Sequence, residues 1–136
     1  GKSLGNAIYL SDSEEEITKK VMSAVTDPNR IRKDDLGNPD VCMVAYYHNL
    51  FSPKEEYEDV CKECRAGSRG CVACKKQLAH NIIETLRPIR EKRKYYEDNP
   101  EVVDKILMEG TAKAKKEAEK TMEKVKKAMR LDYFNK

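Results

Sequence analysis

The segment from Cys61 to Cys74 reads CKECRAGSRGCVAC and separates two stretches of helical character. Ser52-Pro53 is a helix start that precedes it, and apolar residues recur at helical spacing after it, from Leu78 to Ile89. The two glycines within the segment supply the backbone freedom that a turn requires. The sequence therefore predicts two helices joined by a cysteine-rich loop.

Two Cys-x2-Cys pairs lie in this segment, and they form its strongest chemical signal. Neighbouring thiolates at this spacing can bind one ion, and the turn between the pairs completes a tetrahedral set. Four thiolates suit Zn²⁺ and also suit an iron–sulfur cluster. Spacing alone favours zinc held by Cys61, Cys64, Cys71 and Cys74, while the isolated Cys42 is by itself a small apolar residue on a helix.

Helix signals dominate the rest of the chain. Ser13 and Glu16 form a capping box before an apolar stripe that continues to Val25. Asn38-Pro39 is expected to open a helix that runs to Leu50, and Asn99-Pro100 opens a long one that extends to about Leu131. The predicted fold class is all-α: a helical bundle with a cysteine-rich metal or cluster loop and a long C-terminal helix.

Charge is distributed unevenly along the chain. Charged residues make up 38% of the sequence, the mean hydropathy is −0.82 and the net charge is only +3. Between residues 61 and 94, however, ten Lys or Arg face three acids. A basic segment in an otherwise acidic chain favours a surface that meets a polyanion, although a solvated helix face would have the same composition.

Targeting and membrane signals are missing from the sequence. No apolar run approaches the roughly 20 residues needed to cross a bilayer, and no secretory leader precedes the first helix. We therefore expect a cytoplasmic protein without a membrane partner, whose cysteines are ligands and not disulfides.

Several strings, in this order, resemble the tryptophanyl branch of the class I aminoacyl-tRNA synthetases of bacteria. Residues 2–6 (KSLGN) resemble the end of the K-M-S-K-S signature loop, and residues 7–12 (AIYLSD) resemble the segment directly after that loop. Residues 38–42 (NPDVC), 48–52 (HNLFS), 65–67 (RAG), 70–75 (GCVACK) and 88–93 (PIREKR) match the tryptophanyl branch. Each string is weak, but their order and spacing together are specific.

The resemblance implies a C-terminal fragment of a ligase that activates tryptophan with ATP and charges tRNA with it. Residues 1–12 would be the remnant of the ATP-site loop and a connector, and residues 13–136 a helical anticodon-binding domain with its cysteine cluster at 42–74. Lys2 matches the loop lysine that contacts ATP phosphates in the family and stabilises transition-state charge, and Ser3 matches the last loop residue. Without the N-terminal nucleotide-binding domain the fragment is expected to be inactive, and the full-length protein to be a homodimer.

Some bacterial members of this branch bind a [4Fe–4S] cluster through one upstream cysteine followed by Cys-x6-Cys-x2-Cys. The resemblance therefore implies a second ligand set, Cys42, Cys64, Cys71 and Cys74, which leaves out Cys61. The zinc set of the spacing argument, in which Cys61 replaces Cys42, remains the alternative.

The leading functional hypothesis is binding of the tRNA anticodon arm. Unpaired loop bases are the RNA targets that proteins read best, and four cations flank the cysteines: Arg65, Arg69, Lys75 and Lys76. The alternative is a zinc-ribbon module that binds a partner protein through its long helix. A thiol redox enzyme is not favoured, because no thioredoxin-like pattern surrounds the cysteines. His48, on an apolar helix, is expected to be a satisfied core residue.

Overall fold

The computed structural model describes residues 5–32, 34–131 and 133. The described residues form helices and no strand, which confirms the all-α prediction. The α-helices are α1 (Glu14–Ser23), α2 (Met43–Phe51), α3 (Lys54–Arg65), α4 (Cys71–Asp98) and α5 (Pro100–Ala128), and a short 3-10 helix, η2, covers Pro39–Val41. The chain divides into two compact units, Gly1–Arg93 and Lys94–Lys136.

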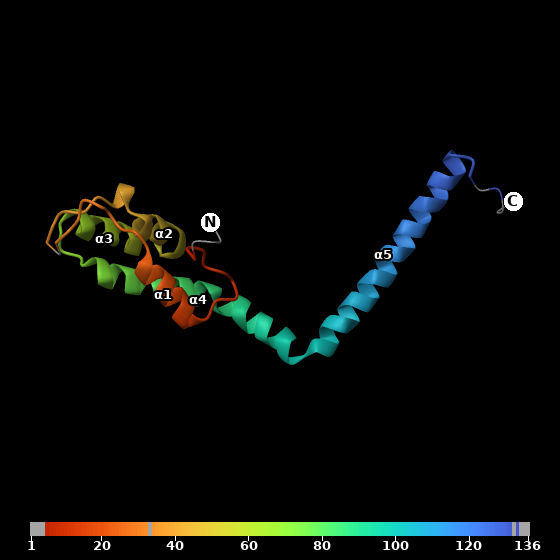
Figure 1. Ribbon diagram of the computed structural model, residues 1–136, viewed down its shortest axis with the longest axis horizontal. Helices are drawn as coiled ribbons and strands as arrows, with labels where there is room; N and C mark the ends of the chain where they lie inside the picture. Colours follow the sequence, from red (N-terminus) through yellow and green to blue (C-terminus); the bar gives the residue numbers. More distant parts are fainter. Residues whose placement is uncertain (1–4, 33, 132, 134–136) are drawn as a thin grey trace. The chain divides into compact units, whose positions relative to one another are not determined.

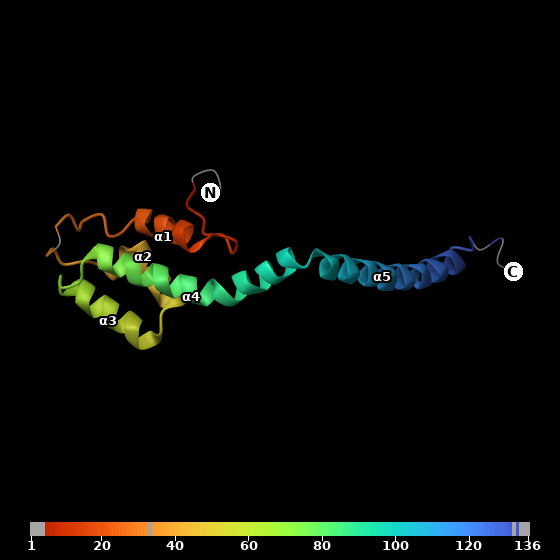
Figure 2. The same ribbon diagram turned by 90° about the horizontal axis from the view of Figure 1, so that it is seen from below.

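The core of the first unit lies where α1 and α2 pack on the first half of α4 (Figures 1 and 2). Its central residues are all buried: Ile17, Val21, Val44, Leu78, Ala79, Ile82 and Leu86. Ile17 and Val21 on α1, and Leu78, Ile82 and Leu86 on α4, recur every four residues, which places them on one stripe of each helix. Two cysteines, Cys42 and Cys74, pack against the edge of this core, so the apolar packing also determines where they lie.

The expected start of α1 is confirmed. The Ser13 hydroxyl accepts a hydrogen bond from the Glu16 backbone N–H (3.2 Å), and the Glu16 carboxylate accepts one from the Ser13 N–H (2.8 Å). The predicted stripe was too long, because α1 ends at Ser23 and Val25 is 73% exposed. Ala24 has an extended backbone, so residue 25 leaves the helical stripe.

The expected helix from Asn38 to Leu50 is interrupted. The Asn38 side chain caps η2 by accepting the Asp40 N–H (3.0 Å), as its position before a proline suggested. Cys42 then takes an extended conformation (φ −94°, ψ 118°) before α2 begins, and Leu50 at the far end is 57% exposed. The break matters because it gives the Cys42 side chain a direction independent of the helical repeat.

The cysteine-rich loop is shorter than predicted. Cys61 and Cys64 lie in the last turns of α3, and Cys71 and Cys74 lie in the first turn of α4, so the connection is only residues 66–70. Gly67 adopts φ +70° in this connection, a conformation that residues with a side chain rarely adopt.

The second unit consists mainly of α5. The helix starts at Pro100, as the Asn99-Pro100 pair predicted, and none of its described side chains is buried. Apolar residues such as Leu107 and Met122 alternate with Lys and Glu along it and are at least half exposed. Across the described residues, no helix combines the length and apolarity that a membrane span needs.

The core predicts a clear contrast between two leucines. Leu78→Ala should lower the free energy of unfolding by about 2–5 kcal/mol, because it removes a buried side chain from a closely packed site. Leu50→Ala, the control at an exposed position of α2, should cost less than about 1 kcal/mol. Denaturant unfolding followed by circular dichroism measures both, and equal losses would contradict the assigned core.

Candidate metal-binding site and basic cleft

One small cavity collects four of the five cysteines from three separate segments. The sulfur-bearing residues in its wall are Cys42, Cys64, Cys71 and Cys74. Cys42 reaches it from the extended residue before α2, Cys64 from the end of α3, and the other two from the first turn of α4. These four are the set implied by the family resemblance, and not the set favoured by spacing alone.

Cys61 does not line this cavity. It is buried elsewhere on α3, where it hydrogen-bonds the Tyr57 side chain and so raises the pKa of that tyrosine. Cys61 and Cys64 are three residues apart on one helix, yet only Cys64 faces the other cysteines. The spacing argument missed this, because a Cys-x2-Cys pair on a helix need not point to one centre.

The arrangement of the thiols bears on what they can hold. Among the residues that the structure describes, no group of three or more His, Cys, Asp or Glu side chains could hold a metal ion as it stands. The cavity that the four cysteines line measures about 20 Å³, and six further residues complete its wall: Thr26, Arg30, Val44, Ala45, Val60 and Arg69. A four-iron cluster needs more room than this cavity offers, so the cysteine side chains would have to turn outward to hold one.

Burial, and not the nearby cations, dominates the chemistry of the two most enclosed thiols. Desolvation raises the pKa of Cys74 to about 11 and also raises the pKa of Cys64 above its usual value. Arg30 beside Cys64 and Arg69 beside Cys74 act to lower the pKa of these thiols, but burial outweighs them. An ion that binds here must displace thiol protons, as all thiolate ligation does.

The loop residues 27–32 and 34–38 lie beside the cysteine cavity, and the Asp27 carboxylate joins the two ends of this loop. Asp27, which is 5% exposed, accepts the backbone N–H of Asn38 (2.8 Å) and of Asn29 (2.9 Å). These hydrogen bonds lower the pKa of the Asp27 carboxyl, and the one from Asn38 has the largest effect. The positive charge of Arg30 lowers the pKa further. The loop is thus tied at both ends to one side chain, and we call this pair of hydrogen bonds the Asp27 clasp.

The loop then lies directly on the end of α3. The Gly37 N–H donates to the Cys64 carbonyl (2.9 Å), and a Cβ at position 37 would lie only 2.5 Å from the Cys64 sulfur. At Gly67 a Cβ would lie 2.7 Å from the Asp34 carbonyl oxygen. Two glycines therefore allow the backbone to approach the cysteine turn closely.

Arg30 is the site residue that the sequence did not single out. The Asp27 clasp fixes the loop so that the Arg30 side chain reaches the cavity, where Nη1 lies 3.8 Å from the Cys64 sulfur and Nη2 lies 3.5 Å from the Gly67 carbonyl. Arg30 also lines the cavity wall. It is thirty-four residues from Cys64 in the chain, and only the folded loop brings the two together.

The four cations predicted to bind RNA have different surroundings. Arg65 is exposed and pairs with Asp40 (3.3 Å). Arg69 is only 15% exposed and binds Glu63 (2.6 Å) and Gln77. Lys75 donates to the Met22 carbonyl (3.0 Å) near the end of α1. Arg69 and Lys75 are thus committed to contacts within the fold.

Lys76 lies instead in an open cleft beside the cysteines. The cleft has a volume of about 640 Å³ and runs between the loop held by the Asp27 clasp and the first turn of α4. Its cations are Arg30, Arg32 and Lys76, and its apolar surface includes the exposed side chains of Ile31 and Val72. Cys71 belongs to both the cleft and the cysteine cavity, so the two sites share a wall.

His48 is a core residue, as expected. Its ring is fully buried, and the Nε2–H donates to the Cys74 carbonyl (3.1 Å) while Nδ1 lies 2.7 Å from the Ser52 hydroxyl. Burial lowers the pKa of His48, so the ring is neutral at neutral pH. It ties α2 to the start of α4 and thereby helps to position Cys74.

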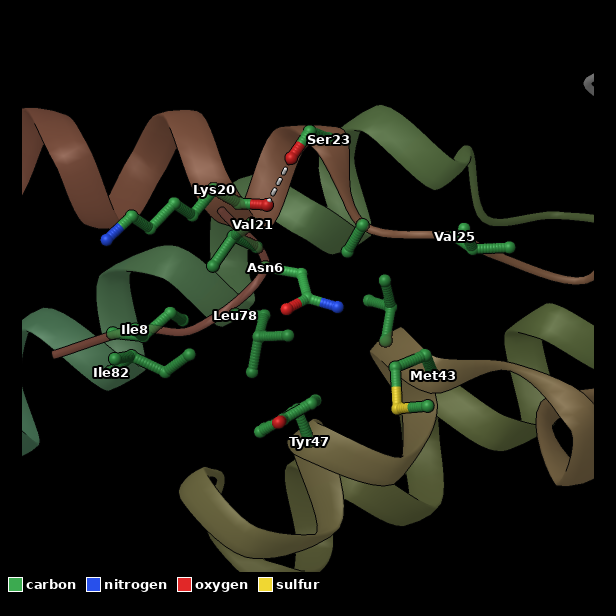
Figure 3. A pocket seen from close by; sticks show the side chains of 12 residues that line it. Asn6, Ile8, Lys20, Val21, Ser23, Val25, Met43, Tyr47, Leu78 and Ile82 are labelled. Atoms are coloured by element: carbon green, nitrogen blue, oxygen red, sulfur yellow. Dashed lines mark hydrogen bonds between the residues drawn. The ribbon is translucent and has the colours of Figure 1, made fainter. Parts of the chain in front are cut away.

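A second cavity, which no cysteine lines, is apolar. It measures about 340 Å³ and is lined by residues of α1, α2, α4 and the segment before α1; Figure 3 shows Ile8, Leu78 and Tyr47 around it. Lys20 lies at its wall, but its ammonium group is held by the Asp12 carboxylate (2.5 Å) and lies 4.7 Å from the centre of the Tyr9 ring. The predicted ATP-loop residues Lys2 and Ser3 lie outside the described residues.

The Asp27 clasp gives a pH-dependent prediction. Because folding lowers the pKa of this carboxyl, its stabilisation is present above the unfolded-state value near 3.8 and is lost as the pH falls through the folded-state pKa. Asp27→Asn should therefore melt at a lower temperature than the unsubstituted protein at neutral pH, and the difference should shrink toward zero in acid. Asp59→Asn, an exposed carboxylate on α3, is the matched control. A difference that does not depend on pH would contradict the clasp.

Comparison with known proteins agrees with this architecture. The model of the family "tRNA synthetases class I (W and Y)" matches residues 1–87. The tryptophan–tRNA ligase of Aquifex aeolicus is 46% identical over 131 residues, which cover 96% of this chain and 33% of that protein. The Thermotoga maritima ligase is 44% identical, with 96% of this chain and 40% of that protein covered.

A solved structure has the same fold. The crystal structure of tryptophanyl-tRNA synthetase from Campylobacter jejuni superposes with a TM-score of 0.84 at 25% identity, covering 95% of this chain and 41% of that one. The chain thus spans between one third and two fifths of the length of these relatives. With the family model matched over more than half of its residues, the chain belongs to the class I tRNA synthetases of the tryptophan and tyrosine type.

Proposed function

We propose that this chain is the tRNA-binding helical part of a tryptophan–tRNA ligase, and that it contacts the anticodon arm through the basic cleft. The observation that carries the proposal is the position of Arg32 and Lys76 on either side of one open cleft that also has exposed apolar surface. Cations bind backbone phosphates, and an apolar wall can receive an unstacked base. A cleft with both features suits a single-stranded RNA loop.

The relatives support the wider activity. They are tryptophan–tRNA ligases, and one Campylobacter jejuni structure was determined in complex with ADP and tryptophan. The complete protein would charge tRNA with tryptophan in an ATP-dependent reaction in the cytoplasm. The catalytic domain, the homodimer and the contact of Lys2 with ATP remain predictions of the resemblance.

For the cysteine cavity we propose a [4Fe–4S] cluster held by Cys42, Cys64, Cys71 and Cys74. One observation supports this set: all four cysteines line one cavity. When bound, such a cluster would supply covalent cross-links between three segments of the chain. The cysteines would then fix the shared wall of the RNA cleft, because Cys71 belongs to both.

The zinc-ribbon alternative is less well supported. It requires Cys61 as a ligand, but Cys61 is buried against Tyr57 and does not line the cavity. A protein-docking role for α5 would account for its exposed apolar residues but assigns no role to the basic cleft.

Charge reversal in the cleft tests the RNA-binding proposal. The double variant Arg32→Glu, Lys76→Glu should bind a tryptophan tRNA anticodon-arm transcript at least about tenfold more weakly, because two phosphate contacts are lost and two repelling charges are added. The slope of log affinity against log salt concentration should also become shallower by about one unit for each lost cation. Fluorescence anisotropy at several salt concentrations measures both the affinity and its salt slope.

The control has the same charge change at a distance from the cleft. Lys19→Glu, Lys54→Glu reverses two exposed cations on α1 and α3 that do not line the cleft. Its affinity should stay within about twofold to threefold of the unsubstituted protein, the difference expected from net charge alone. Equal weakening in both double variants, or none in either, would contradict binding at the cleft.

Single cysteine substitutions test the ligand set. Protein purified without oxygen should be brown with about four iron atoms per chain. Cys64→Ser should lose the colour and the iron, whereas Cys61→Ser should keep both. A colourless protein with one zinc ion that is lost in Cys61→Ser would reverse the assignment and support the zinc set.

A further inference from the structure

The second half of α5 is strongly basic. Between residues 113 and 130, eight Lys or Arg face three acids, a net charge of +5 within a chain whose total is only +3. The stretch before it is acidic, with four acids and one lysine between residues 98 and 109. Positive charge in the second unit is therefore concentrated toward the end of its long helix.

Five of these lysines form one row along the helix. They follow one another at intervals of three or four residues, so a helix with 3.6 residues per turn places them on one side. At 1.5 Å per residue the row extends over about 21 Å. All its members are exposed, and we call it the lysine row: Lys113, Lys116, Lys120, Lys124 and Lys127.

The lysine row is unfavourable for the helix by itself. Each of its members has another lysine three or four residues away, and like charges at that spacing repel each other. Among the described residues, only Lys120 of the row has an ion-pair partner, Glu117 at 2.7 Å. The helix dipole favours cations in the last turn, which accounts for Lys127 but not for the other four. A ligand with negative charges along a line would compensate the row.

We propose that the lysine row binds the phosphate backbone of tRNA, as a contact separate from the basic cleft. The inference rests on the tRNA partner proposed above, but it requires neither the cleft nor the cysteine cavity. An RNA strand presents its negative charges in a line, which a row of cations along a helix can follow. Lysine ammonium groups bind phosphates as point charges, without the fixed geometry that base recognition needs. The row therefore adds affinity without sequence preference.

An anionic membrane is the other polyanion that a basic helix can meet. Helices that lie on a membrane insert large apolar residues, such as Trp, Phe and Leu, while their cations meet the lipid headgroups. Between residues 113 and 130 there is no Trp, Phe or Leu, and the apolar side of this stretch includes the small residues Ala114 and Ala118. The basic half of α5 thus has the charge for a polyanion but little to insert into lipid, which favours RNA.

The test compares two double variants of the full chain that remove the same charge from the same helix. Lys116→Gln, Lys124→Gln removes two members of the lysine row. The control, Lys115→Gln, Lys126→Gln, removes two exposed lysines that neighbour the row in sequence but lie on another side of α5. Glutamine and lysine have similar helix propensities, and circular dichroism checks that the helix content is unchanged.

Binding of a full-length tryptophan tRNA transcript is measured by fluorescence anisotropy at several salt concentrations. The row variant should bind about fivefold to tenfold more weakly than the unsubstituted protein at low salt. Its slope of log affinity against log salt concentration should become shallower by roughly one and a half to two units, because two phosphate contacts are lost. The control should stay within about twofold to threefold. An unrelated tRNA should show the same loss, because phosphate contacts carry no sequence information.

The outcomes separate this inference from binding at the cleft. Unchanged tRNA affinity in the row variant would overturn the lysine row and leave the cleft as the binding site. Weaker binding in the row variant, with unchanged binding in Arg32→Glu, Lys76→Glu, would support the row and overturn the cleft. An unsubstituted protein that does not bind tRNA would overturn both.

Two further results would also overturn the lysine row as an RNA contact. Equal weakening in the row variant and its control would show a general effect of net charge. A row variant that loses binding to phosphatidylserine vesicles but keeps its tRNA affinity would assign the row to a membrane surface.

Discussion

The apolar core that α1, α2 and α4 share positions the cysteines of the first unit. Val44 of α2 and Leu78 of α4 are both almost completely buried in this core, and Cys42 and Cys74 pack against it. His48 adds a hydrogen bond from α2 to the Cys74 carbonyl (3.1 Å). The same apolar contact that stabilises the fold therefore brings cysteines from distant parts of the sequence to one cavity.

Local signals in the sequence identified several helix starts well. The Ser13–Glu16 capping box and the Asn99-Pro100 start were both visible as strings of residues. Helix ends were less predictable, as Val25 and the extended Cys42 illustrate. The periodicity of apolar residues continues past such points, whereas the backbone does not.

The candidate site was harder to predict because its geometry is tertiary. Spacing could not separate Cys61 from Cys64, since the direction of each depends on how α3 packs. Arg30 carried no local signal, and its place beside Cys64 depends on the loop closed by Asp27. Conversely, Lys75 looked available for RNA but is bound to the end of α1. Charge in a sequence does not reveal which cations have internal partners.

The cysteine cavity and the basic cleft form one functional arrangement in this account. Cys71 and Arg30 line both the cysteine cavity and the basic cleft. A change in the position of either side chain would therefore alter both sites. The most direct measurement is anomalous diffraction at the iron edge from crystals grown without oxygen. The account predicts a single strong iron signal surrounded by the sulfurs of Cys42, Cys64, Cys71 and Cys74, with Cys61 outside its coordination. An absence of iron there, or a zinc signal coordinated by Cys61, would contradict it.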